Sequence, residues 1–231
     1  MESQTRLLTG RKGMEGIAAL LLSGILVGCA TGVPSGGTVQ PMADTKPSRE
    51  SHVNFQLHGT IEEVEDGDTV TIKAAPGGGK FAIRMSDIDT PETFHAKNPY
   101  ADDRNKDGSL KFPNAPRDAP GQPLGKAAWA SLNALAPLKA TARADCYETD
   151  IYGRMVCHIF VGTINLNLEQ IKRGWAMTPS NLKWIRDPAS KPAEDAAKVA
   201  KSGVWALPTS KTPDAWRDDC WKAGQCAGAE P

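Results

Sequence analysis

The chain contains 231 residues, 40% of them hydrophobic and 23% charged, and its 27 basic residues balance 27 acidic ones. This length suits one sizeable domain and not obviously two. Because the net charge is zero, no overall field attracts nucleic acid, and any attraction to a polyanion must be local.

The first 28 residues are typical of a signal peptide. Arg6, Arg11 and Lys12 form a basic start, and an apolar run follows over residues 17–27. The run is shorter than the roughly 18–20 residues that a membrane span needs, so it indicates a secretory signal. Cys29 directly follows Leu-Val-Gly, which resembles the signal of bacterial lipoproteins, where this cysteine becomes the lipidated first residue. We therefore expect a lipid-anchored protein of the cell envelope (outer membrane, periplasm or cell surface), and otherwise a secreted one.

Residues 29–52 contain Gly, Ser, Thr, Pro and Lys with almost no apolar pattern, so they predict a flexible tether. A folded domain is expected over residues 53–206. Residues 207–231 form a tail that contains tryptophan and cysteine.

The central feature is a predicted hairpin that follows an alternating strand over residues 58–64. Two runs of β-type residues, Thr69–Ile72 and Phe81–Ile88, flank a Gly- and Pro-rich turn. Folding the hairpin at the turn places Asp68 opposite Asp87 and Asp89, with Glu92 just beyond and Arg84 on the second strand. Clustered carboxylates beside an arginine suit a hard cation and a phosphate. On spacing alone, a solvated acidic hairpin end is an equally open interpretation.

Residues 93–120 break all periodicity and predict a long loop, and loops of this length are usually functional or mobile. Residues 103–108 match the first half of an EF-hand calcium loop, but Asn114 stands where that motif needs a glutamate. We favour a solvated acidic loop over a structural calcium site.

The remaining pattern completes a small α+β domain. Helices are predicted over residues 125–135, 166–173 (capped by Asn165) and 188–202, and strands over 138–146 and 155–161. The order is three strands, a helix, two strands and two helices. This order matches a mainly β fold, a closed five-stranded barrel of the OB type with about three helices.

Four cysteines remain after Cys29. An even number in an exported protein suggests two disulfides. Cys146 and Cys157 lie at similar distances from a turn, and Cys220 and Cys226 lie close together in the tail. The alternative for each is a free buried thiol. The tail also holds tryptophans that we expect to dock it onto the barrel, and a partner-binding role is the alternative.

Three separated motifs resemble the thermonuclease family, the staphylococcal-nuclease-like domains. They are Asp66-Gly67-Asp68-Thr69 with Arg84 and Asp89-Thr90-Pro91-Glu92, then Asp150-Ile151-Tyr152-Gly153-Arg154, then Gly203-Val204-Trp205. The resemblance covers roughly residues 53–206, in order, and its motifs together are far more specific than any one alone.

The resemblance implies a nuclease and assigns roles to six residues. Asp68, Asp89 and the main-chain carbonyl of Thr90 would bind Ca²⁺. Glu92 would be the general base, and Arg84 and Arg154 would bind phosphate. The implied enzyme is a monomeric hydrolase that cleaves DNA and RNA, preferably single-stranded, and leaves 3′-phosphate ends.

The chain departs from the family pattern where a base would stack. Ser180 and Leu182 stand where tyrosines are expected, although Trp175 and Trp184 are nearby and offer aromatic faces. Two rival interpretations remain open: a catalytically silent OB-fold lipoprotein that binds single-stranded nucleic acid, and an envelope lipoprotein whose loop 93–120 and tail bind a protein partner.

Overall fold

A computed structural model describes residues 52–208 and 210–231. The predicted signal peptide, the lipidation site at Cys29 and the tether over 29–52 fall almost entirely on residues 1–51, outside the described residues. Among the described helices, none is both long enough and apolar enough to cross a membrane.

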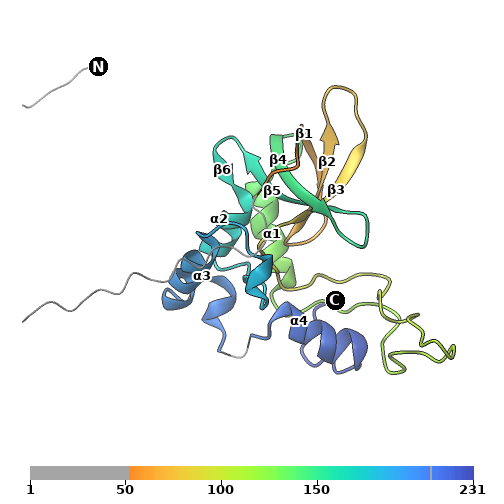
Figure 1. Ribbon diagram of the computed structural model, residues 1–231. Helices are drawn as coiled ribbons and strands as arrows, with labels where there is room; N and C mark the ends of the chain where they lie inside the picture. Colours follow the sequence, from red (N-terminus) through yellow and green to blue (C-terminus); the bar gives the residue numbers. More distant parts are fainter. Residues whose placement is uncertain (1–51, 209) are drawn as a thin grey trace, which may run out of the picture. The chain divides into compact units, whose positions relative to one another are not determined.

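Five strands close into a mixed barrel, as expected for an OB-type α+β fold (Figure 1). They are β1 (Phe55–Val64), β2 (Thr69–Ala74), β3 (Lys80–Met85), β4 (Thr141–Thr149) and β5 (Met155–Val161). The order is β3-β2-β1-β4-β5, and a parallel pairing between β3 and β5 closes the barrel. The two-residue strand β6 (Ile164–Asn165) extends the sheet beyond β5.

Alternating apolar residues on these strands fill the barrel. Ile61 of β1 pairs with Ile72 of β2, and Val70 of β2 pairs with Ile83 of β3, and all are fully buried. This alternation of period two is why these segments form strands around one core. Helix α1 (Gly125–Leu135) covers the core with Leu132.

The remaining helices of the domain follow β6. They are α2 (Leu166–Lys172), η1 (Leu182–Trp184), α3 (Ser190–Val199) and η2 (Gly203–Ala206), η1 and η2 being single 3₁₀ turns. The side chain of Asn165 accepts a hydrogen bond from the Leu168 amide at 3.2 Å, which confirms the predicted cap of α2.

The second strand of the hairpin is shorter than predicted. It ends at Met85, and Asp87 has a φ of 67°, so the chain turns there instead of continuing as a strand. The buried Asp87 carboxylate accepts hydrogen bonds from the amides of Arg186 and Asp187 and lies 3.2 Å from the His158 ring. The expectation that Asp87 would join the acidic cluster is therefore wrong, because this side chain anchors the segment before α3.

The tail docks onto loop 93–120, whereas we expected it to dock onto the barrel (Figure 1). It contains α4 (Pro213–Trp216) and the π-type turn η3 (Arg217–Lys222). The indole N–H groups of Trp216 and Trp221 both donate to the carbonyl of Pro120, at 3.1 and 2.8 Å. Asn98 in the loop donates to the Trp221 carbonyl at 2.7 Å. Loop and tail thus share a small apolar cluster of their own.

Both disulfides form as predicted. Cys146 of β4 pairs directly with Cys157 of β5, and Cys220 and Cys226 close a small loop in the tail. The EF-hand-like segment forms a small turn in which Asp107 accepts hydrogen bonds from Ser109. Residues 104–108 of this turn are exposed.

Replacing Trp216 by alanine should release the tail while the barrel stays folded. The Trp216 side chain is 1% exposed and belongs to the loop–tail cluster, which is separate from the barrel core. Limited proteolysis should cut the tail on the order of tenfold faster or more, because local opening controls cleavage.

The partly exposed Trp184 provides a matched control, and its replacement by alanine should leave the tail resistant. Cooperative unfolding of the whole domain in the Trp216 variant, without early cleavage of the tail, would contradict a separate cluster.

Candidate active site

The turn that links β1 and β2 lies against the segment that follows β3. The Asp68 carboxylate accepts hydrogen bonds from the amide and the hydroxyl of Thr90, both at 3.0 Å. A Cβ atom at Gly67 would lie 2.5 Å from the Thr90 hydroxyl oxygen, so only glycine permits this approach. Asp66 shapes the turn by accepting a hydrogen bond from the Asp68 amide at 2.8 Å.

Arg84 joins the two aspartates that were expected to bind a cation. It lies on β3 opposite Thr69. One guanidinium nitrogen is 2.8 Å from Asp68 Oδ1, and another donates to Asp89 Oδ1 at 3.0 Å. Burial opposes the positive charge of Arg84, but the neighbouring aspartates outweigh it and raise its pKa. Arg84 is therefore a permanent cation at the centre of the cluster.

Glu92 is positioned by its main chain. Its carbonyl accepts a hydrogen bond from the Gln122 amide at 2.8 Å. A Cβ atom at Gly125 would lie 2.0 Å from the same carbonyl, so the glycine lets the first turn of α1 approach closely. Burial raises the pKa of Glu92 to about 8, although the nearby Arg217 guanidinium opposes this shift. A carboxyl with such a pKa suits proton transfer near neutral pH.

The pKa values of two neighbouring acids are raised as well. Burial, reinforced by the charge of Asp68, raises the pKa of Asp66 to about 7. Burial also raises the pKa of Asp89, although Arg217 and Arg84 oppose the shift. Burial thus keeps part of the cluster protonated near neutral pH.

Arg154 reaches the cluster from the turn between β4 and β5. Its Nε donates to Asp150 at 2.8 Å, and its Nη1 donates to the Thr69 hydroxyl at 3.4 Å. The structure therefore brings together all six residues that the sequence predicted for the site: Asp68, Arg84, Asp89, Thr90, Glu92 and Arg154.

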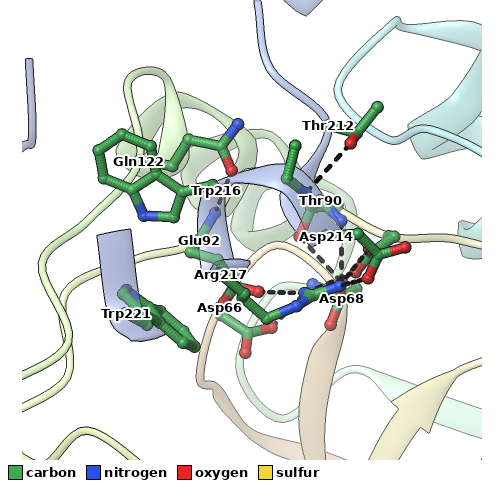
Figure 2. Close-up of polar contacts among 12 residues, drawn as sticks. Asp66, Asp68, Thr90, Glu92, Gln122, Thr212, Asp214, Trp216, Arg217 and Trp221 are labelled. Atoms are coloured by element: carbon green, nitrogen blue, oxygen red, sulfur yellow. Dashed lines mark hydrogen bonds and ion pairs between the residues drawn. The ribbon is translucent and has the colours of Figure 1, made fainter. Parts of the chain in front are cut away.

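The sequence did not predict Arg217, which enters the cluster from the tail. Figure 2 shows its side chain extending from the tail toward the carboxylates. It donates to Asp89 through two nitrogens, at 3.2 and 2.7 Å, and also pairs with Glu92 and Asp214. The one available signal was its place between two tryptophans expected to dock the tail, which did not say where the arginine would point.

Two cavities meet at these arginines. One, of about 640 Å³, is lined by Arg84, Arg154 and Arg217, together with Glu92 and the loop residue Tyr100. The other, of about 300 Å³, is lined by the same arginines and by Trp184 and Ser180. A phosphate bound by the arginines would therefore have space on both sides, with aromatic faces in each.

The donor set of the site fits a hard divalent cation. Asp66, Asp68, Asp89 and Glu92 place four carboxyl groups around the guanidinium groups of Arg84 and Arg217, which supply two positive charges. Carboxylate oxygens are among the donors that Ca²⁺ prefers. In the described part of the chain, however, no three His, Cys, Asp or Glu side chains are arranged around one metal position. Instead, the oxygens of Asp68 and Asp89 are held by Arg84, Arg217 and Thr90.

The chain matches the sequence profile of a known domain family. The sequence profile of the family described as Staphylococcal nuclease homologue matches residues 82–207, more than half of the chain. The match includes Arg84, Asp89, Glu92 and Arg154, whereas Asp68 precedes it. The match agrees with the predicted barrel class.

Two relatives from Bacillus resemble the chain. Over 162 residues it is 30% identical to Endonuclease YhcR of Bacillus subtilis, covering 65% of this chain but 11% of that protein. Over 155 residues it is 26% identical to an uncharacterized protein of Bacillus anthracis, pXO1-141, covering 65% of this chain and 62% of that protein. The chain therefore spans less than two thirds of either relative.

In the absence of cations, the free energy of unfolding should fall as the pH rises from 6.5 to 8. Asp66 and Glu92 have pKa values of about 7 and 8 when folded, but both are ionised across this range in the unfolded chain. The folded protein binds more protons, so stability present at lower pH is lost as these groups ionise. Burial lowers the pKa of His95, which acts in the opposite direction only below its ordinary 6.5.

Urea unfolding in the presence of a chelator, at several pH values, measures this slope. Glu92→Gln should flatten it, because the variant removes one of the two titrating groups. Glu169→Gln, which alters an exposed ion pair on α2, should leave it unchanged. A stability that rises with pH in this window would contradict the account.

Proposed function

This chain belongs to the staphylococcal nuclease family, and we propose that it is a Ca²⁺-dependent hydrolase of the micrococcal type, cleaving phosphodiester bonds in DNA and RNA. The observation that carries the proposal is the convergence of Arg84, Arg154 and Glu92 on one cavity beside the paired aspartates. These are the groups that offset phosphate charge and activate water.

Arg84 and Arg154 would hold the scissile phosphate. The planar guanidinium fork matches two phosphate oxygens and keeps its charge at every physiological pH. The two arginines come from separate elements, β3 and the turn between β4 and β5, so a phosphate between them would be gripped from two sides.

Glu92 would take a proton from the attacking water. The water oxygen would then bond to phosphorus as the bond from phosphorus to the 5′ oxygen breaks, and the 5′ oxygen would take a proton from solvent, which gives a 3′-phosphate and a 5′-hydroxyl. Ca²⁺ bound by Asp68, Asp89 and the Thr90 carbonyl would supply further positive charge to the phosphate. Burial of Glu92, which raises its pKa to about 8, supports its role as a base.

The substrate we propose is single-stranded DNA or RNA bound by a monomer. Splayed bases need aromatic faces on which to stack. Trp184 lines the smaller cavity beside Arg84 and Arg154, and it supplies such a face near Ser180, where the family pattern has tyrosine. Within the described chain, Trp184 is our choice for the residue that holds a base.

We place the enzyme at the cell envelope, anchored by a lipid on Cys29 or else secreted. The sequence pattern of the first 29 residues supports this location. The two disulfides also agree with an oxidising compartment.

The test is the release of acid-soluble fragments from single-stranded DNA by the purified protein, with millimolar Ca²⁺ or with a chelator. Glu92→Gln should lower kcat by about 10²–10⁴-fold, the usual contribution of a general base. Arg154→Ala should lower kcat on the order of 10²-fold or more, because it removes charge stabilisation at the phosphate. The chelator should abolish cleavage.

Matched controls come from α2, where Glu169 and Arg173 pair with each other on the surface. Glu169→Gln and Arg173→Ala should cleave like the unaltered protein. Cleavage that survives in Glu92→Gln and Arg154→Ala would refute the assigned site. DNA binding without cleavage in the unaltered protein would favour the silent nucleic-acid-binding alternative.

A further inference from the structure

Arg217 occupies the side of the acidic cluster that faces the tail. Its two Nη atoms form a fork on both oxygens of Asp89, and Nη1 also contacts Glu92. The Glu92 and Asp89 side chains are 13% and 11% exposed, so this pairing is largely shielded from water. At such low exposure, a guanidinium and a carboxylate attract each other far more strongly than at the surface.

The main chain at Arg217 is held in place by the rest of the tail. The preceding Trp216 is 1% exposed and bonded to Pro120. Cys220, one turn later, is in a disulfide with Cys226. The main-chain N–H of Gln122 donates to the Glu92 carbonyl. Its side-chain amide donates to the Lys211 carbonyl at 2.7 Å, which connects the tail to the site. The guanidinium is therefore delivered to the cluster by a docked element.

The carboxylate oxygens that a cation needs already have donors. Asp68 Oδ2 accepts from Thr90, and Oδ1 faces Arg84. Asp89 Oδ1 accepts from Arg84 and Arg217, and Oδ2 accepts from Arg217. A cation approaching Asp89 meets the guanidinium fork of Arg217 both as a rival for lone pairs and as a like charge.

Of the two arginines, Arg217 can leave the carboxylates more readily. Arg84 bridges Asp68, Asp89 and the Met85 carbonyl from strand β3. Arg217 is also paired with Asp214, which lies one turn away and is 58% exposed. If the Arg217 guanidinium leaves Asp89 and Glu92, Asp214 still provides a partner at the surface.

From this arrangement we propose that Arg217 sets the affinity of the site for its divalent cation, by competing with the cation for Asp89 and Glu92. Asp214 holds the guanidinium when the cation binds. The tail therefore supplies Arg217 to the site, and the docking of the tail on loop 93–120 holds it there. This inference rests on the proposed function for the identity of the cation, but its test measures binding without nucleic acid.

The experiment is calorimetric titration of the purified protein with Ca²⁺ alone. Arg217→Gln should lower the dissociation constant at least tenfold, because the rival charge is removed while the carboxylates stay. Arg173→Gln removes an arginine that pairs with Glu169 on α2, far along the chain from the tail, and should leave the constant unchanged. Protease resistance of residues 207–231 verifies that the tail stays docked in each variant.

Asp214→Asn provides a second, opposite change. Without the outer partner, Arg217 should remain on Asp89 and Glu92, and Ca²⁺ should bind on the order of threefold more weakly. Opposite shifts in the two variants support competition, whether or not the protein cleaves DNA. An unchanged or weaker affinity in Arg217→Gln with a docked tail overturns the inference, as does a failure of both the unaltered protein and Arg217→Gln to bind Ca²⁺ at millimolar concentration.

Discussion

The structure depends on how a buried group of carboxylates is neutralised. Asp66, Asp68, Asp89 and Glu92 converge where β1, β2 and β3 meet, and carboxylates at low exposure repel each other strongly. Arg84 bridges two of them from β3, and Arg217 holds two from the tail. Burial raises the pKa values of Asp66 and Glu92, and the neighbouring carboxylates reinforce the shift. Such a cluster is costly for stability, and it is the arrangement that a cation and a phosphate would complete.

Much of the fold could be predicted because its signals are local. Alternating β-branched residues marked the strands, Asn165 marked the start of α2, and the spacing of the cysteines marked both disulfides. The parallel pairing of β3 with β5 is different, because residues about 70 positions apart meet there and no local pattern encodes their contact. The turn at Asp87 was missed for a related reason. Its left-handed conformation is stabilised by Arg186, Asp187 and His158, which lie far along the chain.

The candidate site, like the fold, could be predicted only where its signals are local. The residues around the hairpin came together as expected. The register of β2 and β3 sets Arg84 opposite Thr69, next to Asp68. Hydrogen bonds from Thr90 to Asp68 and from Gln122 to the Glu92 carbonyl hold the segment that contains Glu92. Arg217 was missed because it lies 125 residues after Glu92 and reaches it only through the docking of the tail. The tryptophans and cysteines indicated that the tail would pack, but hydrophobic packing has no direction that would identify loop 93–120 as the partner. The docking of the tail on loop 93–120 thus brings Arg217 to the site.

The most direct test of this account is a pair of crystal structures of the protein, grown with millimolar Ca²⁺ and with a chelator. We predict that the Ca²⁺ form holds the cation on Asp68 and Asp89, with the Arg217 guanidinium displaced toward Asp214. In the chelator form, Arg217 should lie on Asp89 and Glu92, as it does in the structure described above. A Ca²⁺ form with no cation at these aspartates, and with Arg217 still paired to Asp89, would contradict it.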